Sequence, residues 1–335
     1  MQNGKVSIII PFKNTTHYLP ECLDSIVNQT YTNWEVLAVN DHSTDDSFKL
    51  LTSYSKKDER IKVFQNKGDG IIPALQTAYA QSNGNFVTRM DSDDIMKPNR
   101  LEVMVNALKE NGTGYIAVGQ VNYFSDRGIS NGYERYEEWL NRLTSTGNNF
   151  DEIYKECVIP SPCWMVYRDD FEKCEGFKPQ RYPEDYDLTF RFYEQGFKIV
   201  PCNQVLHLWR DYDTRTSRTH EHYAQNYFLD IKLHYFLKLN HDRTRPLVVW
   251  GAGFKGKKIA KGLKKQGLDF IWLCDNPKKI GKSIYGQELV HFEALQNLDN
   301  PQSIITVANE DAQKEIRSYF TELGQSPLRD YFFFC

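Results

Sequence analysis

Four short apolar runs, each followed by a loop, constrain the fold of the first hundred residues more than any other feature. They span residues 5–11, 34–40, 61–65 and 85–90, and segments with helical spacing separate them. Strands that alternate with helices form mostly parallel sheets, with the helices packed on the faces. We therefore predict an α/β domain in which the carboxyl ends of these strands meet at one edge.

Three carboxylates follow the fourth run within four residues, namely Asp91, Asp93 and Asp94. Like charges this close repel one another unless a cation lies among them. The Asp-x-Asp spacing suits Mg²⁺ or Mn²⁺, which binds one or two carboxylates together with phosphate oxygens. The alternative is a solvated acidic loop, or a cap for the helix that Pro98 introduces.

Composition bounds the class of protein. The chain has 335 residues, enough for about two domains, and its 40% hydrophobic and 25% charged content is typical of a globular protein. A net charge of −3 argues against broad nucleic-acid or anionic-membrane binding other than through a local patch, and no apolar stretch approaches the length of a membrane span. The seven cysteines are scattered without CxxC spacing. We expect a cytoplasmic protein with reduced thiols and no signal peptide.

Later segments suggest further parts of this domain. Residues 125–150 are polar and glycine-punctuated, and we interpret them as a variable segment near an acceptor site. A helix begins at Glu184 and Asp185, and two short strands, 198–201 and 206–209, follow it. Residues 223–239 then predict an aromatic linker helix.

Four motifs in fixed order resemble those of family 2 inverting glycosyltransferases, which have a GT-A fold. They read Val-Ser-Ile-Ile-Ile-Pro at 6–11, Val-Asn-Asp-x-Ser-x-Asp at 39–45, Arg-Met-Asp-Ser-Asp-Asp at 89–94 and Pro-Glu-Asp-Tyr-Asp-Leu at 183–188. The resemblance covers roughly residues 4–220. It implies transfer of a hexosyl or N-acetylhexosaminyl group from a nucleotide sugar, with a UDP-sugar as the expected donor and Mn²⁺ or Mg²⁺ as the cofactor.

The resemblance also assigns the donor site. Asp41 would bind the base or ribose, with the loop at Pro11, Phe12 and Asn14 beneath the base, and Asp91 would lie near the ribose or the sugar. Asp93 would ligate the metal, with His220 as a candidate third ligand and His207 or His222 as alternatives. The remaining candidate donor contacts are Lys67, Arg89, Ser92, Arg210, Ser217 and Arg218.

Asp185 matches the general base of the family, and it would take the proton from the acceptor hydroxyl in a single inverting displacement. Glu184 and Trp164 would lie on the acceptor side. Helix capping is the alternative role for Glu184, and core packing is the alternative for Trp164. Arg89 would contact the donor or form a structural ion pair. The helix after Lys67 departs from the family, which often carries Arg-Asn or Leu-Asn there.

The expected acceptor is a cell-surface glycan or its lipid-linked precursor, and peripheral contact with the inner face of the membrane is compatible with it. A modified tRNA nucleoside is the alternative acceptor. The rival classes are an NAD-dependent oxidoreductase and an inactive nucleotide-sugar-binding protein.

Residues 246–335 predict a separate Rossmann-like domain. Gly251, Gly253 and Gly256 follow an apolar run and open a helix, and Asp275 lies about 20 residues further on, as in a dinucleotide fingerprint. This domain would bind a nucleotide, or pack as a structural or dimerising unit. The predicted domains are thus 1–222, a linker helix and hinge at 223–245, and 246–335.

Overall fold

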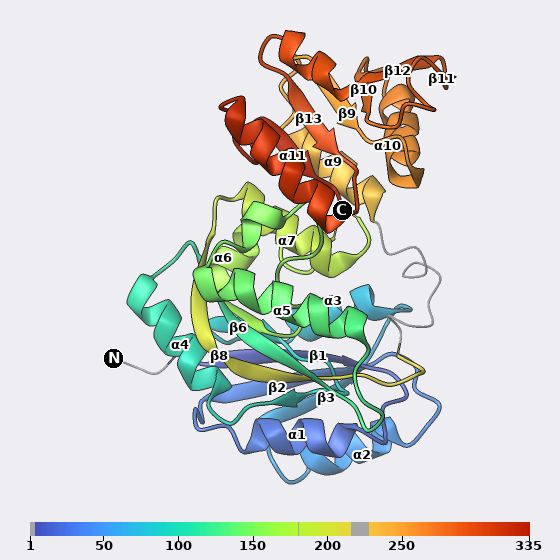
Figure 1. Ribbon diagram of the computed structural model, residues 1–335. Helices are drawn as coiled ribbons and strands as arrows, with labels where there is room; N and C mark the ends of the chain where they lie inside the picture. The colour runs from blue at the N-terminus through green and yellow to red at the C-terminus, as the bar shows by residue number, and fades with distance from the viewer. Residues whose placement is uncertain (1–3, 180, 216–227) are drawn as a thin grey trace. The chain divides into compact units, whose positions relative to one another are not determined.

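The computed structural model describes residues 4–179, 181–215 and 228–335, and these form two compact α/β units (Figure 1). Unit 1 takes in the described residues of 4–150 and 158–215. Unit 2 takes in 151–157 and 228–335. The predicted boundaries did not anticipate that 151–157 would group with the second unit, and the limits of independently folding domains stay a prediction.

Unit 1 is built on an eight-stranded sheet with the order β3-β2-β1-β4-β7-β6-β8-β5. The first four strands are mutually parallel, as the alternation of strands and helices predicted. Strand β7 is antiparallel to both β4 and β6. The strands are β1 (Val6–Phe12), β2 (Trp34–Asn40), β3 (Ile61–Gln65), β4 (Phe86–Arg89), β5 (Ile95–Met96), β6 (Tyr115–Phe124), β7 (Trp164–Tyr167) and β8 (Lys198–Arg210).

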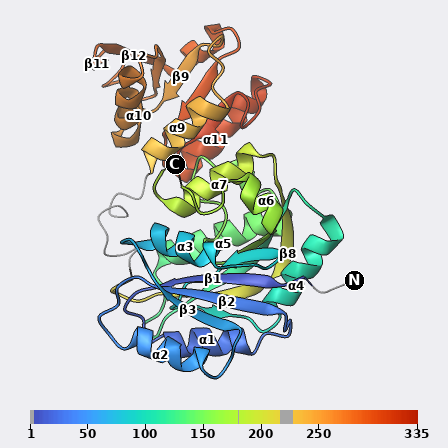
Figure 2. The ribbon, with the colours of Figure 1, turned by 180° about the vertical axis from the view of Figure 1, so that it is seen from behind.

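Helices cover both faces of this sheet, so its central strands are mainly apolar. Helices α1 and α2 lie on one face and α3 on the other (Figures 1 and 2). Val6, Ile8 and Ile10 of β1 join the core formed with α1, where Leu23 and Ile26 are fully buried. The helices are α1 (Leu19–Val27), α2 (Ser47–Ser55), α3 (Ile71–Ala80), α4 (Arg100–Asn111), α5 (Asn131–Thr146), α6 (Arg168–Lys173) and α7 (Glu184–Glu194), with a 3-10 turn at η1 (Asn149–Glu152).

One helix of unit 1 was missed and one prediction was wrong. The polar segment at 125–150 contains the sixteen-residue helix α5, because Leu140 and Leu143 form a buried apolar stripe among its polar residues. Gly147, with a φ of 72°, ends that helix. The two short strands predicted at 198–201 and 206–209 are one long strand, β8, whose pairing with β6 continues through a bulge.

Unit 2 contains a six-stranded sheet with the order β11-β12-β10-β9-β13-β14. All its strands are parallel except the short β11, which pairs antiparallel with β12. Counted from β9 without β11, this is the 3-2-1-4-5 order of a Rossmann-like sheet. The strands are β9 (Leu247–Trp250), β10 (Ile271–Cys274), β11 (Ser283–Ile284), β12 (Gln287–His291), β13 (Gln302–Ile305) and β14 (Tyr331–Phe333).

Helices α9 (Leu229–Leu239), α10 (Phe254–Lys265) and α11 (Glu310–Glu322) and the 3-10 turn η2 (Phe292–Asn297) complete unit 2. The segment 151–157 packs among them through Tyr154, whose ring stacks on Phe334 at 5.3 Å. Lys232 of α9 also donates a 2.8 Å hydrogen bond to the carbonyl of Lys155. These contacts explain why seven residues from the middle of the chain belong to this unit.

No helix among the described residues is long and apolar enough to cross a membrane. All seven cysteines lie within the described residues, none of them forms a disulfide there, and six of them are buried.

Candidate active site

The parallel strands β1 to β4 end at one edge of the unit 1 sheet, and the predicted donor residues gather there. Phe12 accepts the backbone N–H of Asp41 at 2.9 Å, which ties the loops after β1 and β2 together. Asn14, held at a φ of 53°, accepts the Thr44 N–H through its side-chain oxygen at 2.8 Å. Pro11 is half-buried beside these contacts. The loop predicted to lie under the base is thus built by hydrogen bonds between two strand ends.

Asp41 is buried at the centre of this region. One carboxylate oxygen accepts hydrogen bonds from the Asn66 side chain at 2.7 Å and the Gly70 N–H at 2.9 Å, and the other faces the Lys13 ammonium at 3.3 Å. Burial favours a raised pKa for Asp41, but these hydrogen bonds hold the pKa below its ordinary value. Asp41 is therefore an ionised acceptor at neutral pH.

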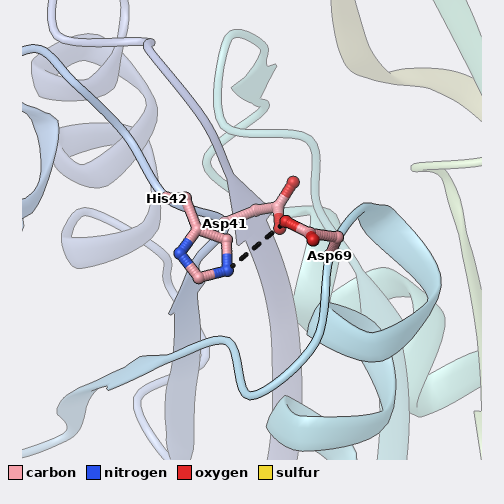
Figure 3. Close-up of side chains that lie close together, drawn as sticks. All are labelled: Asp41, His42 and Asp69. Carbon is pink, nitrogen blue, oxygen red and sulfur yellow. Dashed lines mark ion pairs between the residues drawn. The ribbon is translucent and has the colours of Figure 1, made fainter.

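Asp41, His42 and Asp69 form a group whose potential ligand atoms all lie within 4.8 Å of one another (Figure 3). His42 and Asp69 are exposed, with 3.6 Å between His42 Nε2 and Asp69 Oδ1. The Lys13 ammonium already faces Asp41. The positive charge of Lys13 disfavours a cation there, so we interpret the group as part of a hydrogen-bonded loop cluster.

Asp93 lies in the acidic loop after β4. The Tyr212 hydroxyl donates to its carboxylate at 2.9 Å, and Arg210 Nε donates to its backbone carbonyl at 2.8 Å. Burial, with the charges of Asp94 and Asp91, raises the pKa of Asp93 to about 7. A divalent cation beside Asp93 would relieve this repulsion, so the loop fits the predicted metal.

Asp94 has a different role. One of its oxygens accepts the Arg210 N–H at 2.8 Å, and the other lies 2.9 Å from His207 Nε2. Burial raises the pKa of Asp94 to about 8, against the lowering effect of Arg215. His207 is fully buried, and its second ring nitrogen lies 2.9 Å from Arg100. Both ring nitrogens are occupied, so the suggestion that His207 is a metal ligand was wrong.

Arg89, the last residue of β4, links two groups of acids. Its Nε and a terminal nitrogen contact Asp91 Oδ1 at 3.0 and 2.9 Å, and its other terminal nitrogen contacts Glu184 Oε1 at 3.0 Å. The guanidinium is buried, so solvent screens these ion pairs only weakly. Arg89 thereby brings the acidic loop and the start of α7 into one site.

Glu184 and Asp185 occupy the first turn of α7. Burial and the charge of Asp185 raise the pKa of Glu184 to about 7, although Arg89 opposes the shift. Burial also raises the pKa of Asp185, again against Arg89. Both carboxylates line a small cavity with Arg89, Trp164 and Ser161, and the rest of its wall is apolar except for Thr189: Ile159, Phe177, Leu188, Thr189 and Phe192.

Trp164 is buried, and its indole N–H donates to the Ser161 carbonyl at 2.7 Å. It therefore packs in the core and lines the cavity at once. Ser92 is buried in the acidic loop, and Lys67 is exposed in the loop after β3. The candidates Ser217, Arg218, His220 and His222 lie outside the described residues.

Sequence reasoning missed three residues that hold this site together. Arg100 is fully buried and donates to Thr88 Oγ1 at 3.1 Å and to the carbonyls of Arg89 and Pro162. Tyr212 binds Asp93 directly. Asn66 supports Asp41. The one visible signal in the sequence was Arg100 itself, at the start of a helix with an apolar face. This pattern does not distinguish a buried arginine from an arginine on the surface.

The glycine fingerprint of unit 2 has the expected geometry. A Cβ on Gly256 would lie 2.0 Å from the Gly251 carbonyl oxygen, so only glycine permits this close approach of helix and strand. Gly251 has a φ of 114°, which also favours glycine. A Cβ on Gly253 would meet open space, and Asp275 is exposed just after β10. The turn is therefore accessible.

Comparison with known proteins agrees with the geometry of unit 1. The chain is 31% identical over 170 residues to an uncharacterized glycosyltransferase of Rickettsia bellii, a match that covers 49% of this chain and 23% of that protein. It is 29% identical over 216 residues to glycosyltransferase GlyA of Streptococcus pneumoniae, covering 62% of this chain and 31% of GlyA. The chain thus spans about a quarter to a third of these relatives.

The fold is shared with TarS residues 1–349 of S. aureus, solved in complex with UDP-GlcNAc. The TM-score is 0.55 at 18% identity, and the match covers 78% of this chain and 72% of that one. This likeness confirms the predicted GT-A fold. The family model for glycosyl transferase family 2 matches residues 7–175, about half of the chain. By its motifs, its fold and this match, the chain belongs to glycosyl transferase family 2.

Proposed function

We propose that the chain transfers a sugar from a nucleotide sugar to an acceptor hydroxyl, with inversion at the anomeric carbon and with the help of a divalent cation. The observation that carries this proposal is the position of Arg89 between Asp91 and Glu184. A displacement needs the leaving diphosphate and the base for the nucleophile on opposite sides of one carbon. The Arg89 ion pairs support such an arrangement, because they join the two sets of acids.

The donor would be a UDP-sugar. Asp41 is buried, ionised and set among loops from three strands, which suits recognition of a base or ribose. Asp91 would lie by the ribose or the sugar, above the loop at Pro11 and Asn14. TarS, which shares the fold, was solved with UDP-GlcNAc, and this motivates UDP-sugars as the first donors to test. Arg210, with Ser217 and Arg218, is proposed to cover the diphosphate.

Asp93 would hold Mn²⁺ or Mg²⁺ together with diphosphate oxygens, and His220 is proposed as a further ligand. A mononuclear site of this kind needs only one or two carboxylates from the protein. The bound cation would neutralise charge that develops on the leaving diphosphate. The hydrogen bonds of Arg210 and Tyr212 would keep the acidic loop in place during this step.

Asp185 would act as the general base. The raised pKa of Asp185 makes it a stronger base than an exposed aspartate, because burial disfavours its ionised form. It would accept the proton of the acceptor hydroxyl as that oxygen attacks the anomeric carbon. Glu184, held by Arg89, would position this turn of α7. Trp164 would present its ring to the acceptor from the wall of the cavity.

The acceptor is proposed to be a cell-surface glycan or its lipid-linked precursor, modified in the cytoplasm. This part of the proposal rests on the resemblance of the four motifs to those of family 2 glycosyltransferases. A homodimer formed through unit 2 is part of the same proposal.

The central experiment is calorimetric titration of UDP, with and without Mn²⁺, combined with a transfer assay. We expect Asp93→Asn to lose the Mn²⁺-dependent part of UDP affinity. We expect Asp185→Asn to keep that affinity and to lower turnover by roughly 10²–10⁴-fold. The exposed Asp299→Asn is the matched control. UDP affinity that is equal in the wild type and Asp93→Asn would refute the metal ligand, and normal turnover in Asp185→Asn would refute the base.

A second nucleotide site in unit 2 is also proposed, because Gly251 and Gly256 adopt the geometry of a dinucleotide turn. The N-terminus of α10 would face a phosphate, and Asp275 would meet a ribose hydroxyl. In the titration, the wild type should bind two nucleotides per chain and Gly253→Val should bind one. A stoichiometry of one in the wild type would contradict this second site.

A further inference from the structure

Helix α10 (Phe254–Lys265) of unit 2 has one buried face and one strongly basic face. Ile259, Ala260 and Leu263 are buried. A Cβ on Gly262 would lie 2.5 Å from the Leu233 side chain of α9, so α9 and α10 pack closely there. Five of the six lysines of α10 are exposed: Lys257, Lys258, Lys261, Lys264 and Lys265. The exposed face of α10 is therefore cationic.

Positive charge continues into the neighbouring loop. Residues 254–285 contain nine lysines and two aspartates, a balance of +7 in a chain whose net charge is −3, so the remaining residues carry −10. Within the described parts of the chain, Lys257, Lys261, Lys264 and Lys265 form no ion pair with a carboxylate. The charge of this region is thus concentrated and largely uncompensated.

Two aromatic rings lie among these lysines. Phe254 is 53% exposed and Tyr285 is 41% exposed, and they are two of only four strongly exposed large apolar side chains in the described residues. The Lys258 ammonium lies 5.0 Å from the centre of the Phe254 ring. The Lys261 ammonium lies 5.0 Å from the centre of the Tyr285 ring. Both rings keep a large exposed surface beside a cation, and the Tyr285 ring also stacks on Trp272 with 6.4 Å between the ring centres.

The spacing places these groups on one stripe. Phe254, Lys258, Lys261 and Lys265 follow one another at intervals of four, three and four residues, so they share a face of the helix. Tyr285 extends the stripe sideways through its contact with Lys261 and the hydrogen bond that its carbonyl accepts from Lys264. We name these five residues, Phe254, Lys258, Lys261, Lys265 and Tyr285, the α10 surface.

We propose that the α10 surface binds the anionic face of a lipid bilayer. Lysines near anionic headgroups are attracted by the negative potential of the leaflet, and aromatic side chains enter the boundary between headgroups and acyl chains. Residues 254–285 contain no arginine, although arginine is the side chain best suited to gripping individual phosphates of a nucleic acid. A diffuse charged surface with exposed rings therefore fits a bilayer better. The inference does not depend on the proposed transfer reaction.

Co-sedimentation of the full chain with vesicles tests this inference. Vesicles of phosphatidylcholine alone are compared with vesicles that also contain phosphatidylglycerol, at low and at high salt. Binding should require phosphatidylglycerol and should weaken with salt, because counterions screen the lysines. The triple variant Lys258→Gln, Lys261→Gln, Lys265→Gln should bind on the order of 100-fold more weakly than wild type. The pair Phe254→Ala, Tyr285→Ala should lose the binding that persists at high salt.

The matched control is a second triple variant, Lys49→Gln, Lys56→Gln, Lys57→Gln, which removes the same charge from exposed positions in and after α2. It should bind vesicles like the wild type. The inference is overturned if the wild-type chain ignores phosphatidylglycerol, or if the two triple variants weaken binding equally. Binding to soluble polyphosphate without binding to anionic vesicles would overturn it as well.

Discussion

Arg100 and His207 are in contact at 2.9 Å, and both side chains are fully buried. Arginine has only donors, so His207 Nδ1 must accept and Nε2 must carry the proton that it donates to Asp94. The pKa of His207 lies well below its ordinary value because of burial and the charge of Arg100, so the ring is neutral. One arginine thereby fixes the tautomer that holds the acidic loop.

Replacing Arg100 with Met should destabilise the fold by at least about 2 kcal/mol, because buried acceptors on His207 and Pro162 lose their donor. Urea unfolding at neutral pH measures the change. Arg135→Met, at an exposed position of α5, is the control and should change stability little. Equal midpoints for wild type and Arg100→Met would contradict this role of Arg100.

Arg89→Lys tests the link between the acidic loop and α7. Lysine keeps the charge, but it cannot contact Asp91 and Glu184 with two ends of a planar group. We expect turnover to fall roughly 100-fold, since a shift of about 1 Å in reacting groups has that effect. Arg60→Lys, which changes an arginine forked onto Asp58, should leave turnover unchanged. A full rate in Arg89→Lys would show that the two acids need no common partner.

Turnover at saturating donor and metal should rise with pH through an apparent pKa near 7. Burial raises the pKa of Glu184 to about 7 and raises that of Asp185, and a general base works only when it is ionised. The apparent value belongs to the pair, because the two groups interact. The measurement is turnover as a function of pH, over about one pH unit on either side of pH 7. A flat profile there would exclude a base with a raised pKa.

Lys232 supplies a prediction about stability. It is buried in α9, where burial lowers its pKa from 10.5 to about 8. Between these values the unfolded chain binds more protons than the folded chain, so stability should increase as the pH rises from about 8 towards 10.5. The gain relative to Lys232→Met should reach about 3 kcal/mol. Denaturant curves of the two chains at several pH values measure it, and parallel curves would contradict the lowered pKa.

The regular part of the fold was readable from the sequence. Strands at 34–40 and 61–65 have the predicted bounds, since each is a mainly apolar run followed by a loop. Helix α5 was missed because its apolar residues are sparse and its exposed face dominates the composition. The local sequence pattern determines these strands, whereas packing against β6 and β8 determines helix α5.

The sequence predicted individual residues of the candidate site but not the contacts that join them. Short motifs single out Asp41, Asp93 and Asp185, because clustered acids at strand and helix ends are unusual. The contacts of Arg89 with Glu184 and of Arg100 with His207 join residues about a hundred positions apart. No local pattern encodes such a distance, so the roles of Arg100 and His207 appeared only in the structure.

The membership of residues 151–157 in unit 2 has a consequence for how this protein can be rearranged. The chain passes between the units three times, near 150, 158 and 220, so no single cut separates them. A break near Arg245 would remove Phe332 and Phe334 from Tyr154, although its contacts with Phe236 and Asn240 would remain. A gene fusion or exchange that moves only the C-terminal part of the chain would not carry the whole of unit 2. Residues 151–157 would have to be moved together with the C-terminal part of unit 2, so we expect the two units to evolve together.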